Sequence, residues 1–282
     1  MSAADSFDAE QSEAPLKDAE ILRKTESGKR SQWRIELARL KLWPPTPPAV
    51  ERYYHGWVHV GNERMLRRLI RDRQPRVILE LGAWLGLCTQ FLAEESAPHG
   101  SLVLAIDRWD GRWLLQTQQA QYAADEEALG MLSSSLPLYE TFLANLWALQ
   151  SRVFPIRMDT KAGMHRISQL GVPVDLVYVD ADHTKEATLA DIHNAVTLFP
   201  DAVVCGDDWQ WPDVRDAVEH YVDASGGQLR AQSHPAENWW CLERTVAARQ
   251  HPDLSKPRVT PSSSSQTCRR TRVDFVVAHE EV

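Results

Sequence analysis

Five short apolar runs recur along the middle of the chain, and turn residues or an acid follow most of them. They cover residues 77–81, 101–107, 153–157, 174–179 and 202–206. Between most of these runs, apolar side chains recur every three or four positions, as on one face of a helix. Short apolar runs are typical of strands covered on both faces, as in a parallel sheet flanked by helices. The pattern predicts an α/β fold.

Two more strands and six helices extend this expected core. The helices cover 31–43, 62–74, 87–94, 137–149, 187–198 and 214–222, and the strands cover 228–231 and 238–243. Asn62 is the expected N-cap of the second helix, because its side chain can accept a hydrogen bond from a free helix amide. The polar stretch 110–135 interrupts the pattern, and we expect it to be an insertion that acts as a mobile lid.

The composition divides the chain into four parts. Residues 1–30 are rich in Ala, Ser and acids and lack the features of a signal peptide, so we expect disorder. Residues 31–75 are expected to form a helical cap on residues 76–245, which carry the α/β pattern. Proline and a run of serines predict that residues 246–282 are a flexible tail.

Composition and charge favour a small-molecule partner. The 282 residues are 43% hydrophobic and 25% charged, as in soluble globular proteins. A net charge of −8 argues against nucleic-acid binding, and no apolar stretch is long enough to span a membrane. The cysteines Cys88, Cys205, Cys241 and Cys268 lack metal-ligand spacing and predict reduced thiols in the cytoplasm. The sequence does not decide whether the chain forms a homo-oligomer.

The first apolar run leads into a glycine turn with the pattern Glu80-x-Gly82-x-x-x-Gly86. Glycines there let a ligand approach the backbone, and the first amides of the next helix are free donors. The spacing departs from the dinucleotide pattern G-x-G-x-x-G, with Trp84 where a middle glycine would stand. The Glu80 carboxylate would repel phosphate and attract an amino group or a sulfonium. The alternative is a plain strand-turn-helix connection without a ligand.

Two other strand ends carry an acid. Asp107 ends the run 101–107, where a carboxylate can accept both ribose hydroxyls of a nucleoside. Trp109 is interpreted either as a side chain that stacks on a base or as a partly buried loop aromatic. Asp159, just beyond 153–157, can accept a hydrogen bond from an exocyclic amine or cap the next helix.

Three acids follow the next two strands. Asp180 comes directly after 174–179, and Asp207 and Asp208 come directly after 202–206. Neighbouring parallel strands bring these carboxylates to one edge of the sheet, where they repel one another unless a cation compensates. Oxygen ligands are those that Mg²⁺ prefers. The sequence therefore favours a metal site over the alternative of separate solvated acids and helix caps.

The order of these motifs resembles that of the class I S-adenosylmethionine-dependent methyltransferases. Residues 179–183 (Val-Asp-Ala-Asp-His) and 206–209 (Gly-Asp-Asp-Trp) are similar to the cation-dependent O-methyltransferases, and closer still to methyltransferase domain family 24. The resemblance covers about residues 76–244. It implies a Rossmann-like, doubly wound, mostly parallel seven-stranded sheet with helices on both faces and an antiparallel last strand.

The resemblance also implies roles for particular residues. Cofactor contacts fall on Glu80, Gly82, Ala83, Gly86, Cys88, Asp107, Arg108, Trp109 and Asp159. The ligands of Mg²⁺ or another divalent cation are Asp180, Asp207 and Asp208. His183 stands where the plant and animal enzymes place a catalytic lysine, so His183 and Asp182 are the candidate catalytic residues. His183 is either a base or a solvated residue at a helix start, and Asp182 either orients the acceptor or caps that helix.

These expectations combine into one functional hypothesis. We expect a cytoplasmic enzyme that transfers a methyl group from S-adenosylmethionine to an oxygen of a small molecule, assisted by a divalent cation. One alternative is an N-methyltransferase that needs no metal. Another is a cofactor-binding or scaffold protein that kept the fold without the chemistry, since a fold does not determine a function.

Overall fold

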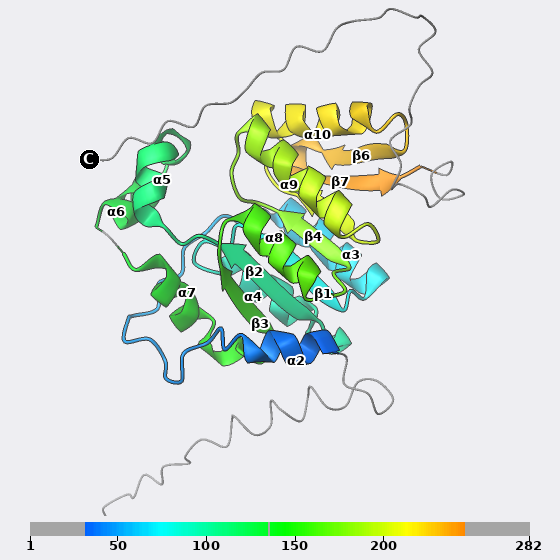
Figure 1. Ribbon diagram of the computed structural model, residues 1–282. Helices are drawn as coiled ribbons and strands as arrows, with labels where there is room; N and C mark the ends of the chain where they lie inside the picture. Colours follow the sequence, from blue (N-terminus) through cyan, green and yellow to red (C-terminus); the bar gives the residue numbers. More distant parts are fainter. Residues whose placement is uncertain (1–31, 135, 246–282) are drawn as a thin grey trace, which may run out of the picture.

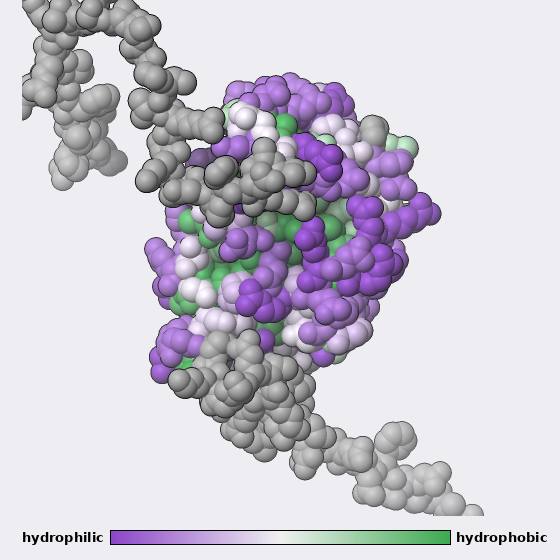
Figure 2. Space-filling view, turned by 90° about the vertical axis from the view of Figure 1, so that its right-hand side faces the viewer, coloured by the Kyte–Doolittle hydropathy of each residue, from purple (hydrophilic) through white to green (hydrophobic). Residues whose placement is uncertain are grey.

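The computed structural model describes residues 32–134 and 136–245 (Figure 1). The expected disordered start at 1–30 and flexible tail at 246–282 lie outside the described residues. Within the described residues, no helix is both long and apolar enough to cross a membrane. Hydrophilic residues predominate on the face displayed in Figure 2, with apolar residues in a narrower band between them.

The centre of the molecule is a seven-stranded sheet with the order β3-β2-β1-β4-β5-β7-β6. Its strands are β1 (Val77–Leu81), β2 (Leu102–Asp107), β3 (Val153–Arg157), β4 (Leu176–Val179), β5 (Val203–Gly206), β6 (Leu229–His234) and β7 (Trp239–Arg244). The first five pair in parallel, whereas β7 runs antiparallel to both β5 and β6. This confirms the Rossmann-like, mostly parallel sheet with an antiparallel last strand.

Helices cover both faces of the sheet. They are α2 (Gln32–Arg39), α3 (Val60–Arg73), α4 (Leu87–Glu95), α5 (Gly111–Thr117), α6 (Glu126–Ser133), α7 (Leu138–Asn145), α8 (Thr160–Gln169), α9 (Lys185–Leu198) and α10 (Pro212–Ala224). In Figure 1, α8, α9 and α10 lie in front of the sheet, and α3 and α4 lie behind it. Successive residues of β1 point to opposite faces, so Ile78 packs with α3 and α4, and Leu79 packs with α8 and α9.

The ends of α2 and α7 and the start of α3 differ from the expected ones, and helix α8 was not expected as a separate segment. Asn62 does not cap α3, because the helix begins at Val60 with His59 as its N-cap. Asn62 is instead fully buried, and its amide donates a hydrogen bond to the hydroxyl of Tyr178 (3.2 Å). Trp43 lies beyond the end of α2, and its indole donates to the carbonyl of Val153 (2.8 Å). Asn62 and Trp43 each make a hydrogen bond to a distant part of the chain, and this contact accounts for a residue that we had interpreted as part of a helix pattern.

The polar insertion is helical. It forms α5, the short 3₁₀ helix η2 (Gln119–Tyr122) and α6. The carboxylates of Asp110 and Asp125 cap the first and last of these helices by accepting from Trp113 N and Ala128 N. The composition hid α5 and η2 because neither contains a buried residue, whereas α6 packs Ala128, Met131 and Leu132 into the core.

Candidate active site

A cavity of about 620 Å³ opens at the carboxyl ends of the parallel strands. Its walls include the glycine turn after β1, Asp107 of β2, and the acids that follow β4 and β5. The chain order of the strands reverses between β1 and β4, so the loops after these strands leave the sheet on opposite sides and open a crevice. The predicted motifs after β1, β2, β4 and β5 therefore meet at one cavity.

The turn after β1 requires its glycines. Gly82 has φ +83°, and a Cβ atom there would lie 1.9 Å from the carbonyl oxygen of Asp180. Gly86 has φ +91° and is the N-cap of α4, where a Cβ atom would press on Leu146. Gly82 and Ala83 line the cavity. The close approach of β1 to the loop after β4 therefore brings bare backbone to the cavity wall.

The Asp107 carboxylate stabilises this turn through hydrogen bonds to backbone amides. Its Oδ2 accepts hydrogen bonds from the amides of Ala83 and Trp84 (2.9 Å each), and its Oδ1 accepts from the amide of Trp109 (2.7 Å). Burial raises the pKa of Asp107, while these amide bonds oppose the rise. The carboxylate also lines the cavity, next to Arg108. It can therefore hold the turn and still accept from a ligand hydroxyl.

Glu80 lies behind the cavity wall. It is fully buried, and its Oε2 accepts a hydrogen bond from the hydroxyl of Thr89 (2.5 Å). Burial raises the pKa of Glu80 to about 8, although the Thr89 bond works in the opposite direction. Cys88 is one of the residues that line the cavity, whereas Glu80 is not. The structure therefore does not place Glu80 where a cationic ligand in the cavity would touch it directly.

Trp109 was expected either to stack on a base or to be a buried loop aromatic, and Asp159 either to bind an amine or to cap a helix. The Trp109 ring is 3% exposed, packs against Tyr139 and Phe142, and donates its indole N–H to the carbonyl of Trp84 (2.6 Å). This geometry supports the buried loop aromatic. Asp159 caps α8 by accepting from Ala162 N (2.9 Å), and it also lines the cavity.

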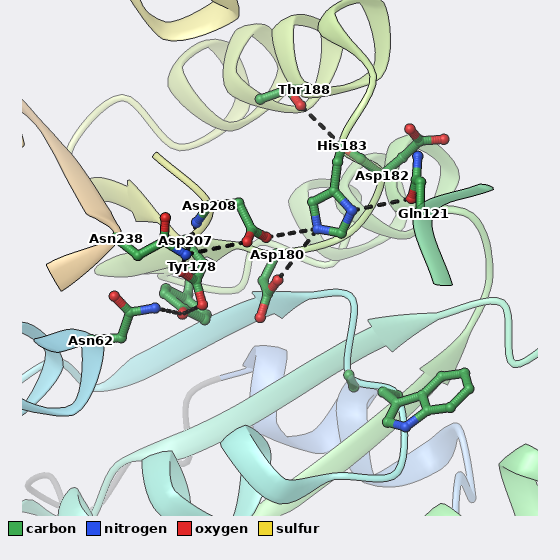
Figure 3. Close-up of polar contacts among 12 residues, drawn as sticks. Asn62, Gln121, Tyr178, Asp180, Asp182, His183, Thr188, Asp207, Asp208 and Asn238 are labelled. Atoms are coloured by element: carbon green, nitrogen blue, oxygen red, sulfur yellow. Dashed lines mark hydrogen bonds and ion pairs between the residues drawn. The ribbon is translucent and has the colours of Figure 1, made fainter. Parts of the chain in front are cut away.

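Asp180, His183 and Asp208 point toward one another (Figure 3), and all three line the cavity. One ligand atom from each lies within 4.8 Å of the others, close enough for a single metal ion. The Nε2 atom of His183 lies 2.7 Å from Oδ2 of Asp208 and 3.9 Å from Oδ1 of Asp180. A nitrogen and two carboxylate oxygens fit a divalent cation chemically.

Asp207, an expected metal ligand, is directed elsewhere. It is 4% exposed, its Oδ1 accepts from the amide of Asn238 (3.0 Å), and its Oδ2 lies 3.4 Å from the hydroxyl of Tyr178. Burial, with the charges of Asp180 and Asp208 added, raises the pKa of Asp207 to about 8. The observed three-residue group contains His183 in place of Asp207.

Two carboxylates surround His183, the candidate base, and affect its pKa. Burial alone would lower the pKa of His183, but pairing with Asp180 and Asp208 outweighs burial and raises it to about 10. In the absence of a cation, the two carboxylates therefore favour the protonated form of the ring. Asp182 accepts hydrogen bonds from Thr184 N (2.8 Å) and from the amide of Gln118 (2.5 Å), so it shapes the start of α9 and contacts the insertion.

An aromatic group that the sequence analysis did not identify covers the cavity. Trp57, Trp84 and Tyr122 have ring centroids 5.7 to 5.9 Å apart. Asp125 accepts from the Trp57 indole (3.0 Å) and lies 3.5 Å from His55 Nε2. The segment before α3 and the insertion are therefore tied together over the cavity. No periodicity marks these residues, because Trp57 and Trp84 lie in loops and Tyr122 ends the short helix η2.

Four non-glycine residues at or beside the cavity have a left-handed backbone. They are Trp84 (φ 47°), Trp109 (φ 46°), Asp208 (φ 61°) and Asn238 (φ 62°). Such conformations cost free energy in residues with a Cβ atom and persist only where the surroundings impose them. The hydrogen bonds of Asp107 and Asn238 supply that constraint here.

The sequence match agrees with this geometry. Residues 79–209 match a family model described as a methyltransferase domain, and this range runs from β1 to the acids after β5. No curated protein matches the chain. The family model, the seven-stranded sheet and the cavity at its switch point together support a class I S-adenosylmethionine-dependent methyltransferase domain within this chain.

Solved structures with a similar fold come from several organisms. A cofactor-bound protein from MTB is 19% identical, covers 82% of this chain and 97% of its own, and has a TM-score of 0.47. A putative O-methyltransferase from Klebsiella pneumoniae is 16% identical, with coverages of 80% and 94% and a TM-score of 0.45. An O-methyltransferase from Bacillus cereus in complex with SAH is also 16% identical, with coverages of 80% and 96% and a TM-score of 0.44.

Proposed function

We propose that this methyltransferase transfers the methyl group of S-adenosylmethionine to an oxygen of a small molecule, with a divalent cation at Asp180 and Asp208. The observation that carries the proposal is the group of Asp180, His183 and Asp208 in the same cavity as the Gly82 turn. Carboxylates this close repel one another unless a positive charge lies between them. A cation there would lower the pKa of a bound hydroxyl and hold its oxygen.

The chain's own residues would position the cofactor. The backbone of Gly82 and Ala83 can approach the amino-acid part of the cofactor, and Asp107 can accept from the ribose hydroxyls while it holds the turn. Asp159 lies on the same wall and remains the candidate for the adenine amine. Orientation of the two reactants is the larger part of what the protein supplies, because methyl transfer needs the oxygen, methyl carbon and sulfur in line.

The acceptor would enter between the acids and the aromatic cover. Trp57, Tyr122 and Trp211 line the cavity, so its walls suit a compact molecule with apolar surface. When the cofactor is bound, such a cover would limit the access of water to the sulfonium, protect the cofactor and strengthen electrostatic interactions inside.

Incubation of the purified chain with labelled S-adenosylmethionine and a metabolite pool tests this proposal. Mass spectrometry should find a product methylated on oxygen, chelator should abolish its formation, and added Mn²⁺ or Mg²⁺ should restore it. Asp208→Asn should lose turnover and keep S-adenosylhomocysteine binding. Asp216→Asn, at an exposed residue on α10, is the matched control and should remain active.

One observation favours the metal-independent alternative. A protonated His183 already compensates the charges of Asp180 and Asp208 without a cation. Unchanged turnover in excess chelator, with the methyl group on nitrogen, would favour that N-methyltransferase. A protein that binds neither S-adenosylmethionine nor S-adenosylhomocysteine would contradict the whole proposal.

A further inference from the structure

We propose that His183 is itself a ligand of the cation, and that the site therefore prefers Mn²⁺ or a similar transition metal to Mg²⁺. The proposal rests on the cation in the proposed function and names its ligands and its kind. It replaces the catalytic-base role of His183 with coordination through Nε2, and it leaves Asp207 outside the ligand set.

The positions of the three side chains carry the first step. Nε2 of His183 faces both carboxylates, at 2.7 Å from Asp208 and 3.9 Å from Asp180. The three come from the loops after β4 and β5, which the parallel pairing of these strands holds side by side. All three side chains are no more than about one-fifth exposed. The Nε2 atom is buried from solvent.

Gln121 fixes which ring nitrogen is free to coordinate. Its Oε1 lies 3.1 Å from Nδ1 of His183 (Figure 3), and a carbonyl oxygen can only accept. This contact favours the tautomer with the hydrogen on Nδ1, which leaves the lone pair of a neutral ring on Nε2, facing the two carboxylates. Metal-binding histidines commonly donate their other N–H to a carbonyl or carboxylate in this way.

The ring is also held against rotation. It packs against Trp211, with ring centroids 4.9 Å apart and an interplanar angle of 30°. Gln121 belongs to η2 of the insertion, so the element that covers the cavity also orients the ligand. A lone pair aimed at two carboxylates is repelled by them, and either a proton or a metal ion between the three groups removes the repulsion.

The nitrogen ligand determines the kind of metal. Mg²⁺ favours oxygen ligands in a regular octahedron and gains little from imidazole, whereas Mn²⁺, Fe²⁺, Co²⁺ and Zn²⁺ bind imidazole together with carboxylates. Asp207 does not supply a third carboxylate to the metal site, because its Oδ1 accepts hydrogen bonds from the Asn238 amide and from Asp208 N. With one nitrogen and two acids, the set should bind Mn²⁺ at least tenfold more tightly than Mg²⁺.

Electron spin echo spectroscopy of the full chain loaded with Mn²⁺, without cofactor, tests this directly. A ¹⁴N coupling typical of imidazole should appear and should disappear in His183→Gln. It should persist in His59→Gln, which alters another histidine of the cavity wall, and in His193→Gln, on the exposed face of α9. Titration calorimetry should show that His183→Gln reduces the Mn²⁺ preference and leaves S-adenosylhomocysteine affinity unchanged.

The outcomes separate this inference from the proposed function. Bound Mn²⁺ without the ¹⁴N coupling, or equal affinity for Mg²⁺ and Mn²⁺, would overturn the role of His183 while the metal-assisted reaction stands. A chain that binds no divalent cation and turns over in chelator would overturn both. Gln121→Leu provides a second test, because loss of the Nδ1 partner should weaken Mn²⁺ binding and keep the coupling.

Discussion

Gly82 and Asp180 approach so closely that no side chain fits between them. A Cβ atom on Gly82 would lie 1.9 Å from the carbonyl oxygen of Asp180, and Gly82 has φ +83°. Both residues follow directly on neighbouring strands, β1 and β4. The contact fixes the distance between the cofactor turn and the acids of the proposed metal site.

Gly82→Ala should therefore be strongly destabilising and should weaken cofactor binding. The added methyl must displace backbone rather than a side chain, so we expect a loss of roughly 3 kcal/mol or more in the free energy of unfolding. Gly100→Ala is the matched control, because Gly100 has φ +70° and nothing within 4 Å of its Cβ position. Denaturant unfolding of both variants measures the difference, and equal losses would show that backbone angle alone is responsible.

Asp107→Ala should reduce the affinity for S-adenosylmethionine and S-adenosylhomocysteine. The change removes the acceptor for the amides of Ala83 and Trp84 and the proposed partner of the ribose hydroxyls. Loss of such a charged acceptor costs roughly 1–3 kcal/mol, or about 5- to 150-fold in affinity. Calorimetry checks this against Asp72→Ala, which alters an exposed acid on α3. Unchanged affinity in Asp107→Ala would exclude the carboxylate from the cofactor site.

Glu80 should make the protein less stable as the pH rises. Its folded pKa is raised to about 8 from 4.5, so below pH 4.5 the carboxyl is protonated in both states and its stabilising contribution is fully present. Between these values the unfolded chain releases the proton while the folded chain keeps it, and stability falls until about pH 8. The total loss should be roughly 3–5 kcal/mol.

Glu80→Gln removes this titration and keeps an acceptor for Thr89. Its free energy of unfolding should therefore vary less between pH 5 and pH 8 than that of the natural chain, as measured by denaturant unfolding. Glu94→Gln, at an exposed position on the same α4 helix, serves as control. Parallel pH curves for Glu80→Gln and the natural chain would contradict the assignment.

Asp207 and Asp208 should differ although they are neighbours in sequence. Asp208 faces His183, and Asp207 faces Asn238 and Tyr178. Asp208→Asn should weaken Mn²⁺ binding at least tenfold, whereas Asp207→Asn should mainly change the thermal unfolding temperature. Calorimetry and thermal unfolding of the two variants distinguish these effects. Stronger loss of metal binding in Asp207→Asn would restore the ligand set inferred from the sequence.

The parallel core was predictable because its strands are buried on both faces. The runs at β1, β2 and β5 are apolar at nearly every position, and their acids or glycines mark the carboxyl edge. The same rule placed Asp107, Asp180 and Asp208 at one cavity. Periodicity was less informative for the insertion, because α5 and η2 contain no buried residue and α6 is short.

Side-chain direction was the part that the sequence could not supply. Asp207 and Asp208 are adjacent residues of the same type, so the sequence does not distinguish them. In the structure Asp208 has a left-handed backbone, and the two carboxylates face different partners. Glu80 looked like a cavity residue, although the alternation of β1 directs it behind the wall to Thr89. The aromatic cover depends on contacts between residues far apart in the chain, such as Trp57 and Tyr122.

The left-handed residues also indicate where this protein can be made more heat-resistant. Glycine at Trp84, Asp208 or Asn238 would relieve backbone strain, but it would remove side chains that shape the cavity. Gln74 has the same conformation (φ 46°), is exposed, and ends α3 where glycine is the favoured residue. Engineering for thermal tolerance should therefore begin with Gln74→Gly, which leaves the catalytic end of the sheet untouched.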